Sequence, residues 1–523
     1  MLRTCSHVTG IVRSKVSGLI SNYFFSGYKL KLMKKVLPIF ALIFFVFING
    51  NSQKSSLFFD VKALVGGTSS GYVPFWLRSN QYGSIPLDNA SLSLIGAVRK
   101  DYDTSKTRIF DWGASAEGRA NIGHKSNFTL IEGYGKLRIS VFEIRAGRSR
   151  EIMGICDTSL SSGAFAVSGN ALGIPKVQIS IPEFYSIPIF GKLFAFKGSF
   201  AYGWVGKTSQ YQFPSSIIIH LDTYLHQKSF YGRFGKPDWK LKLYGGFNHQ
   251  VYWGNEKELY VDLFTLSPMQ TYLYVITGKP YGTNNIGSSK IGNHLGSIDL
   301  GFEYEFDRVR ILAYRQNFYD CGALYYLANI RDGLNGLSLS NTRQTGNGFQ
   351  WKKMLIEVLN SKNQAGEFWS PPTPSGDENY YNNDQFLEGW SYKGIGIGNP
   401  FICPRASTRE GLPSDPRDYF INNRVIAFHF GFEGSFQKWD FIVKTSYSLN
   451  YGTFGTSEVG HTLGKYRTLP VYGIFSETKQ LSTYFEANKE LRNGLNFGFT
   501  GAFDAGELYY NSVGLLFRIS KSF

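Results

Sequence analysis

Alternation of apolar and polar residues is the main pattern along this chain. The final stretch, residues 513–523, shows it clearly, because its apolar side chains occupy every second position: Val513, Leu515, Phe517 and Ile519. A period of two predicts a β-strand with one apolar face. The same pattern recurs within 110–120, 194–204, 298–306, 426–451 and 495–503. The chain is therefore expected to consist mainly of strands.

The residues on the face opposite the apolar one indicate whether these strands lie in lipid or in water. Charged residues such as Asp299, Glu303 and Glu433 stand between the apolar ones, which suits lipid on one side and a water-filled lumen on the other. In lipid, only a closed barrel removes every open strand edge. The expected fold class is therefore all-β, a transmembrane antiparallel β-barrel of about 18 strands. A soluble sandwich also alternates and is the alternative.

Residues 1–53 are expected to be an upstream extension followed by a Sec signal peptide. Lys34 and Lys35 precede the apolar run 36–48, and small and polar residues follow it. The run is too short for a comfortable transmembrane helix. Met33 is the expected true start, and the expected location of the exported protein is the bacterial outer membrane.

The remainder divides into two parts. Residues 54–97 contain two prolines and no sustained alternation, so a plug, a lid or a short helical segment is expected there. Residues 98–523 are expected to form the barrel. Counting strands back from the C-terminus puts the long stretches 370–422 and 452–480 outside the cell and the tight turn 435–437 in the periplasm, the usual outer-membrane arrangement.

Composition and charge narrow the class of protein. Gly 58, Tyr 33 and Phe 44, with 18% charged residues, describe turns and aromatic strands rather than a helical enzyme. The formal net charge is +16, which favours acidic partners, although solvated surface lysines explain it equally well. The expected partners are capsular or other acidic surface polysaccharide and outer-membrane lipid or lipopolysaccharide. Nucleic acid is not expected, and the protein is expected to be a monomer.

Motifs for catalysis or metal binding are weak. The cysteines lie far apart, at Cys5, Cys156, Cys321 and Cys403, which argues against a zinc ribbon or a disulfide scaffold and leaves pairing of the last three open. GTSSG at 67–71 matches a nucleophile elbow, but a proline soon follows where a helix is required. The eight histidines form no H-x-x-x-H pair. No catalytic residue, cofactor or metal is therefore expected.

Several short motifs resemble one known family. They are VPFWLRSNQYGSIP at 73–86, ISIPEF at 179–184, GKPDW at 235–239, NHLGS at 293–297, YYNN at 380–383 and NNRV at 422–425. In order and spread they resemble the capsule assembly protein Wzi family, over nearly all of the chain after the N-terminal region. The resemblance implies an outer-membrane barrel of about eighteen strands that holds exported capsular polysaccharide on the cell surface as a lectin-like protein without catalysis.

Candidate binding residues follow from how proteins hold sugar polymers, through aromatic faces and planar amide or guanidinium groups. The outer stretch offers Trp369, Tyr380, Tyr381, Asn382, Asn383, Trp390 and Tyr392, and the N-terminal region offers Trp76, Arg78, Asn80, Gln81 and Tyr82. The alternatives are a loop packed on itself for the first group and a fixed turn for the second. Arg424 and Lys444 are expected either to point into the lumen or to pair with Glu433 or Asp440.

The expected function is attachment of capsular or related surface polysaccharide at the outer face of the barrel, without catalysis. The alternative is a porin-like channel for small solutes or oligosaccharides, which would conduct ions in planar bilayers. An outer-membrane enzyme acting on lipid or glycan is a further alternative, and the missing catalytic constellation counts against it.

Overall fold

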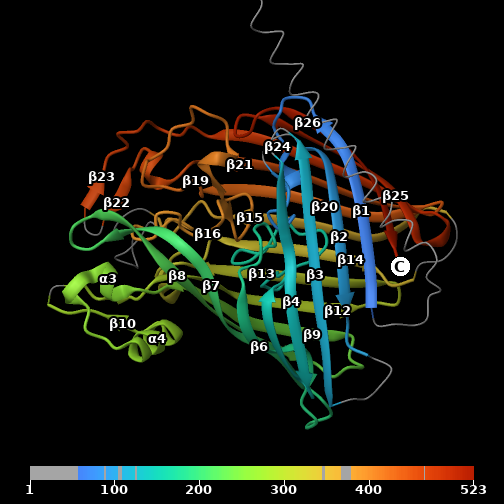
Figure 1. Cartoon of the computed structure of the whole chain (residues 1–523), viewed down its shortest axis with the longest axis horizontal. Coiled ribbons are helices and arrows are strands. Elements are labelled where there is room, and N and C mark those ends of the chain that lie inside the picture. Colours follow the sequence, from blue (N-terminus) through green and yellow to red (C-terminus); the bar gives the residue numbers. More distant parts are fainter. Residues whose placement is uncertain are drawn as a thin grey trace, which may run out of the picture. The chain divides into compact units, whose positions relative to one another are not determined.

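Eighteen antiparallel strands form one closed barrel in the computed structural model (Figure 1). The structure describes residues 57–86, 90–103, 109–123, 126–284, 286–343, 348–366, 378–463 and 466–523, and all the strands belong to one unit, Ser56–Ser522. Because β26 pairs back with β1, the wall has no open edge. The predicted fold class and strand number are confirmed.

The wall strands follow one another in chain order around the barrel. They are β1 (Leu57–Thr68), β2 (Ala90–Lys100), β3 (Phe110–Gly123), β4 (Asn127–Ile139), β5 (Phe142–Arg148), β6 (Lys176–Ser186), β7 (Phe194–Gln212), β8 (Ile217–Phe234), β9 (Leu241–Trp253), β12 (Asn293–Glu305), β13 (Val309–Tyr319), β14 (Gly333–Asn341), β15 (Gln350–Asn360), β20 (Val425–Phe436), β21 (Trp439–Asn450), β24 (Thr478–Glu490), β25 (Leu495–Gly506) and β26 (Ser512–Ser522).

Alternate side chains of each strand face opposite sides of the wall. On β26, Val513, Leu515 and Phe517 are each at least half exposed, whereas Arg518 turns inward and donates to Glu486 of β24 (2.8 Å). Exposed apolar residues recur around the wall, which gives the apolar outer band of a barrel in lipid. The apolar face predicted for the final strand therefore points outward, and the protein is an outer-membrane barrel.

The two ends of the barrel differ in the length of their connections. Residues 140–141 join β4 to β5 and residues 437–438 join β20 to β21 at the end where β26 finishes. The long connections 149–175, 361–424 and 451–477 leave from the opposite end. In outer-membrane barrels the short turns face the periplasm and the long loops face outward.

The stretch 54–97, expected to be a plug or lid, is partly wall. β1 and β2 are wall strands that pair with each other along nearly their whole length, and only residues 69–86 between them fold inward. β1 reads LFFDVKALVGGT, which does not alternate cleanly, and its strand character was hidden for that reason.

Three connections from the long-loop end fill part of the lumen: the roof segment (residues 69–86), the 149–175 segment and the 378–424 segment. Their apolar side chains form one core, which includes Phe75, Trp76, Leu77, Leu160, Phe165, Tyr380, Tyr381, Trp390 and Phe420. The short elements here are α2 (Phe75–Arg78), β16 (Ser391–Tyr392), β17 (Ile395–Gly396), β18 (Cys403–Pro404), β19 (Phe420–Asn422) and a 3-10 turn, Arg405–Ser407. A packed interior therefore replaces an open pore over part of the barrel.

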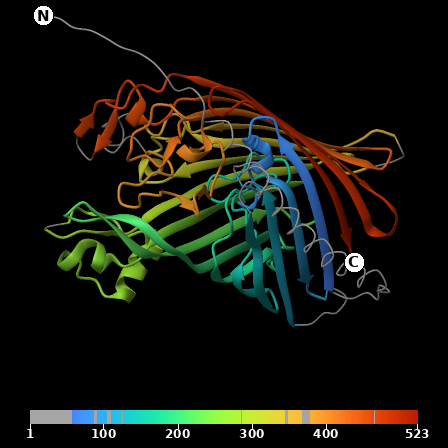
Figure 2. The ribbon, with the colours of Figure 1, turned by 45° about the horizontal axis from the view of Figure 1, so that its top comes forward.

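Other short elements lie in the remaining connections. Between β9 and β12 are α3 (Glu256–Tyr260), the 3-10 turn Val261–Leu263, α4 (Pro268–Thr277), β10 (Pro280–Tyr281) and β11 (Ser289–Lys290); elsewhere are β22 (His461–Leu463), β23 (Tyr466–Thr468) and the 3-10 turns Ala323–Tyr326, Phe454–Thr456 and Arg492–Gly494. Figures 1 and 2 both show α3 and α4 beside the long-loop ends of β7 and β8. Among the described residues, no helix is both long enough and apolar enough to cross a membrane.

Candidate functional site

The roof segment is fixed in the lumen by strands near the closing seam of the barrel. The backbone N–H of Phe75 donates to Asp504 Oδ2 on β25 (2.8 Å), and the indole N–H of Trp76 donates to Ser446 Oγ on β21 (3.1 Å). Phe75 and Trp76 are almost fully buried. Since buried hydrogen bonds are costly to break without replacement, the roof segment has a defined position.

Beyond α2, the roof segment lies against the 149–175 segment. Asn80 and Tyr82 have φ angles of 56° and 52°, in the left-handed region, which asparagine adopts more readily than tyrosine. The Tyr82 N–H donates to the Gly169 carbonyl (2.8 Å), and the Asn80 amide donates to another carbonyl of the same segment (2.9 Å). These bonds fix the position of Gln81, which lies between the two left-handed residues and borders two cavities.

The two cavities, called here the first and second chambers, adjoin the roof segment and have a volume of about 210 Å³ each. The first chamber is bordered by Trp76, Ser79, Asn80, Asp157, Thr158 and Lys444 among others, and the second by Lys62, Glu117, Arg119, Arg150 and Arg518 among others. Gln81, Tyr82, Tyr484 and Glu486 border both. Because a water needs about 10–15 Å³ of such volume, each chamber has room for on the order of ten waters.

Positive charge predominates in the second chamber. Two of its basic residues pair with acids, Arg150 with Glu117 and Arg518 with Glu486 (2.8 Å). Among the described residues, Lys62 has no acidic partner, and Arg119 donates only to neutral asparagine and serine oxygens, at 2.9 Å, 2.9 Å and 3.4 Å. Basic side chains of the chamber therefore outnumber the acids Glu117 and Glu486, each of which is ion-paired with one of them.

A buried carboxylate fixes the start of the 378–424 segment. Glu378 accepts backbone N–H groups of the β13–β14 connection at 2.7–3.2 Å, from Asp320, Cys321, Gly322 and Ala323. Burial and the negative charge of Glu378 raise the pKa of Asp320 well above its ordinary value. Asp332 accepts from the Tyr380 hydroxyl (2.9 Å), and burial raises the pKa of Asp332 to about 6 despite the hydrogen bonds it accepts. Docking of this segment is thus coupled to protonation.

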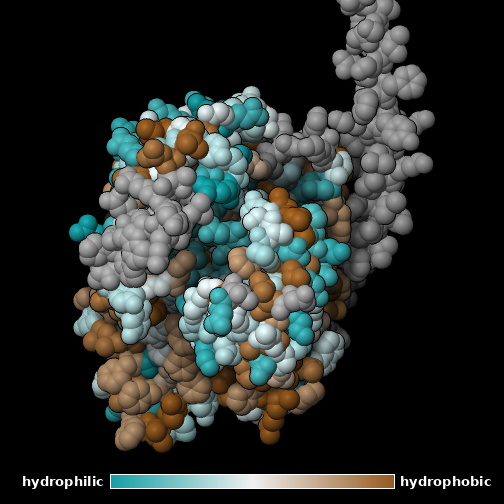
Figure 3. Space-filling model, turned by 90° about the vertical axis from the view of Figure 1, so that its left-hand side faces the viewer, coloured by the Kyte–Doolittle hydropathy of each residue, from teal (hydrophilic) through white to brown (hydrophobic). Residues whose placement is uncertain are grey.

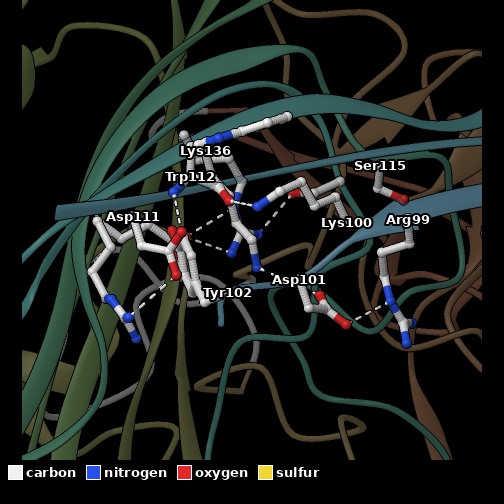
Figure 4. A network of polar contacts seen from close by, with 12 residues as sticks. Arg99, Lys100, Asp101, Tyr102, Asp111, Trp112, Ser115 and Lys136 are labelled. Carbon is white, nitrogen blue, oxygen red and sulfur yellow. Dashed lines mark hydrogen bonds and ion pairs between the residues drawn. The ribbon is translucent and has the colours of Figure 1, made fainter. Parts of the chain in front are cut away.

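A second polar network lines the wall at the short-turn end, where Figure 4 shows Tyr102 and Asp111 among basic side chains. The Tyr102 hydroxyl donates to Glu143 (3.0 Å), and its ring centroid lies 4.3 Å from the Lys136 ammonium and 4.6 Å from the Arg138 guanidinium. Asp111 pairs with Arg138 (3.5 Å). Burial and the charge of Glu143 raise the pKa of Tyr102, a residue of the β2–β3 turn. Charged side chains therefore lie at the short-turn end of the barrel as well as in the chambers.

The opposite end carries the long connections. Figure 3 views this face and shows hydrophilic residues around a recess near its middle, with hydrophobic residues mostly towards the edges. A polar mouth surrounded by apolar side chains is the arrangement expected where a hydrophilic lumen opens at the outer surface of a membrane barrel.

The five candidate residues near the N-terminus lie inside the barrel rather than on an outer face. Trp76 is buried, and Arg78 donates to the Ser407 carbonyl (3.3 Å). Asn80, Gln81 and Tyr82 border the first chamber. The polar side chains of these three residues therefore face the lumen and not the cell exterior.

The candidate residues of the outer stretch are mostly buried as well. Trp369 lies outside the described residues; Tyr380, Tyr381, Asn382, Trp390 and Tyr392 are at most 7% exposed, and Asn383 is half-buried. Their polar atoms serve the core, as in the bond from Trp390 Nε1 to the Ala166 carbonyl (3.0 Å). Because these aromatic rings are buried inside the barrel, they have no exposed face on which a polymer could stack. The outer binding surface expected from the sequence is therefore wrong, and these residues form part of an internal core.

Lys444 borders the first chamber, which agrees with the prediction that it points into the lumen. It does not pair with Asp440, which instead pairs with Lys352 (2.6 Å), and Arg424 donates to the Lys362 carbonyl (3.1 Å). Sequence reasoning missed Lys62, Arg119 and Glu378. Strand parity could have found Arg119, whose strand β3 alternates. The interrupted alternation of β1 hid Lys62, and no local pattern reveals Glu378. In the described part of the chain, no group of His, Cys, Asp or Glu is placed to hold a metal ion.

Comparison with known proteins gives a likeness of fold alone. No family model matches the chain, and no curated protein matches its sequence. Among solved structures, OccAB2 of Acinetobacter baumannii has a TM-score of 0.44 at 11% identity, covering 89% of this chain and 98% of that chain. OccK2 (OpdF) of Pseudomonas aeruginosa, in complex with glucuronate, has 0.42 at 10%, covering 89% and 97%. The outer membrane protein OprD of Pseudomonas aeruginosa has 0.41 at 10%, covering 90% and 94%.

Two expectations from the sequence are wrong. The barrels that this chain resembles are OprD and Occ porins, a different outer-membrane family from the capsule assembly protein Wzi family. Anchoring of capsular polysaccharide, which that resemblance implied, is overturned with it. Two of the motifs, at 73–86 and 380–383, lie in the inner segments, where their aromatic side chains belong to the buried core.

Proposed function

We propose that the barrel is a porin-like channel for small hydrophilic solutes and that it favours anions over cations. The observation that carries this proposal is the pair of adjoining polar chambers beneath the roof segment, inside a wall of eighteen strands. Barrels of 16–18 strands are wide enough to leave an aqueous path. The excess of basic over acidic side chains in the second chamber, to which Lys62 and Arg119 contribute, supports the preference for anions, because it raises the local concentration of negative solutes.

The three inner segments set the size limit of this path. Their shared core includes side chains that water does not reach, such as Phe165 and Tyr380, so they narrow the lumen and leave space only in chambers of about 210 Å³. Polymers are too large for such spaces. Small solutes pass by way of the chambers, with small displacements of the inner segments admitting them.

Planar-bilayer recording of the purified full chain tests this proposal. We expect ion conductance, and a reversal potential under a KCl gradient that shows preference for chloride. Lys62→Gln and Arg119→Gln should each reduce that preference, while Lys240→Gln, a control at an exposed residue of the β8–β9 turn, should leave it unchanged. An electrically closed barrel would contradict the proposal.

Two further properties belong to this proposal. Residues 34–53 act as the export signal, which sequencing of the mature N-terminus from outer-membrane fractions tests: a mature chain that begins upstream of Lys34 would contradict it. The protein moves solutes without altering them, so mass spectrometry of glycans, lipids and transported solutes after incubation with the barrel should show no change of mass.

A further inference from the structure

The connection between β9 and β12 folds back over the outer face of the barrel wall. Tyr252 of β9 packs in the core of the lumen, whereas its neighbour Val251 packs in a second core with Phe264 and Val275 of the connection. Successive residues of a strand face opposite sides of the wall, so the second core lies outside the barrel. Its cover consists of residues 254–284 and 286–292, called here the outer strap, whose helices α3 and α4 lie beside the wall in Figures 1 and 2.

Three histidines lie beneath the outer strap, on neighbouring wall strands. His226 of β8 and His294 of β12 both stand opposite Val251 in the strand register, and His249 of β9 lies two residues before Val251. All three therefore share the outward face of Val251. Each is at most 8% exposed, and the ring centroid of Tyr272 on α4 lies 5.8 Å from that of His226. The outer strap thus separates the three rings from the surroundings of the barrel.

Hydrogen bonds fix the protons of two of these rings. His294 Nε2 lies 2.9 Å from the carbonyl oxygen of Ile291 in the outer strap, and a carbonyl only accepts, so this nitrogen carries a proton. In a neutral ring the other nitrogen, Nδ1, is then an acceptor, and His249 Nε2 donates to it (2.9 Å). His249 Nδ1 is buried without a partner in the described chain. A proton added to His294 would break the pair, and one added to His249 would leave a buried donor unpaired.

The charged groups that act on these rings are basic. They are Lys228 of β8 and Lys290 of β11, which is part of the outer strap. The Lys228 ammonium donates to the Ile276 carbonyl near the end of α4, and the Lys290 ammonium donates to the Cys321 carbonyl (2.9 Å). Within the described residues, none of the three histidines forms an ion pair. A proton on any of them therefore adds a like charge beside two ammonium groups.

The remaining titratable neighbours do not offset such a charge. Glu256, the buried acid of α3, accepts the Gly254 N–H of its own turn (2.7 Å). Tyr272 of α4 and Tyr319 of β13, the aromatic neighbours of the rings, stay neutral below pH 8, because a phenol titrates near pH 10. The histidines are therefore neutral while the outer strap covers them, and they gain their ordinary affinity for protons only when it lifts.

From this geometry we propose that the outer strap is a pH-sensitive element of the outer surface, which stays on the wall while the three histidines are neutral and lifts when they take up protons. Histidine in water titrates near pH 6.5. The lifted state therefore binds more protons than the docked state, so docking weakens as pH falls. Between pH 7.5 and 5, each histidine that charges only in the lifted state shifts the equilibrium about 30-fold. The proposal concerns the outside of the wall and does not depend on conduction.

Amide hydrogen exchange of the detergent-solubilised full chain tests the proposal. Exchange rates at pH 7.5 and pH 5 are divided by the rates of an unfolded chain at the same pH, which gives a protection factor free of the chemical effect of pH. We expect the protection factors of α4 (Pro268–Thr277) to fall at least about 30-fold at pH 5. Those of the wall strand β26 (Ser512–Ser522), which carries no histidine or acid, should stay unchanged.

The matched variants replace histidine by glutamine, which keeps a hydrogen-bonding side chain and does not titrate. The triple variant H226Q, H249Q and H294Q should keep the protection of α4 at both pH values. His220→Gln is the control, because His220 also lies on β8 but is exposed and bonded to Ser209 Oγ (3.2 Å), and it should lose protection as the wild type does. His226→Gln alone, which leaves the His249–His294 pair intact, should show a smaller fall than the wild type.

Two results would overturn the inference. Equal protection of α4 at pH 7.5 and pH 5 in the wild type would show that acid does not lift the outer strap. An equal fall in H220Q and H226Q would assign the pH effect to other groups, and this comparison holds even if the triple variant fails to dock the strap at pH 7.5.

Discussion

Replacing Glu378 by glutamine tests whether the 378–424 segment is held in the lumen by one carboxylate. Each oxygen of Glu378 accepts two backbone N–H groups. Glutamine turns one oxygen into an N–H₂ group that faces two donors, so two hydrogen bonds to a charged acceptor are lost. Such bonds contribute about 1.5–3 kcal/mol each. Removing the repulsion between Glu378 and Asp320 offsets part of this, which leaves a net loss of about 2–4 kcal/mol.

Amide hydrogen exchange and bilayer recording measure that loss. In E378Q we expect the amides of residues 320–323 to exchange about 30-fold to several-hundred-fold faster, from the same free energy, and the mean conductance to rise as the segment undocks. Glu410→Gln is the matched control, because Glu410 lies in the same segment, is exposed and loses the same charge. If E378Q and E410Q show equal exchange and equal conductance, the carboxylate does not hold the segment.

Three further predictions follow from other parts of the barrel. Burial raises the pKa of Asp332 from 3.8 to about 6, so the folded state holds this proton more tightly, and docking should lose about 3 kcal/mol as pH rises from below 3.8 to above 6. Conductance should increase over that range in wild type and increase less in D332N, where only other groups such as Asp320 still titrate. Leu300→Arg places a charge on the lipid face and should lower the unfolding free energy in liposomes by about 2–4 kcal/mol, against at most about 1 kcal/mol for Leu241→Arg at a strand end. Gly398→Ala puts a Cβ 2.0 Å from a backbone carbonyl and a tyrosine hydroxyl, so the melting temperature should fall, while Gly287→Ala, with nothing within 4 Å, should leave it unchanged.

The wall of the barrel could be predicted from the sequence because its pattern is local. A strand has a period of two, so the positions of Val513, Leu515 and Phe517 alone define which face meets lipid. Of the two expectations for Lys444, pointing into the lumen agrees with the structure. β1 was missed because its alternation is interrupted by adjacent apolar residues, Phe58 with Phe59 and Leu64 with Val65.

The interior could not be predicted, because its contacts join residues distant in the chain. Tyr380 and Trp390 are suited both to an outer sugar-binding surface and to a buried core, and only the fold of the 378–424 segment decides between these. The partners of Glu378 lie more than fifty residues earlier in the chain. Their contribution is backbone N–H groups, which every residue except proline possesses, so no side-chain pattern marks them.

The pairing of β1 with β26 has a consequence for how the protein is made. Lys62 of β1 stands opposite Ser520 of β26, so the seam joins the first strand to the last. The roof segment follows β1 directly, yet its hydrogen-bond acceptors, Ser446 and Asp504, lie on late strands. During synthesis and insertion the early strands must therefore wait, with an unpaired edge and an undocked roof, until the end of the chain arrives. A chain cut short before β25 would lose both the β1–β26 pairing and Asp504, the acceptor that holds Phe75 of the roof segment.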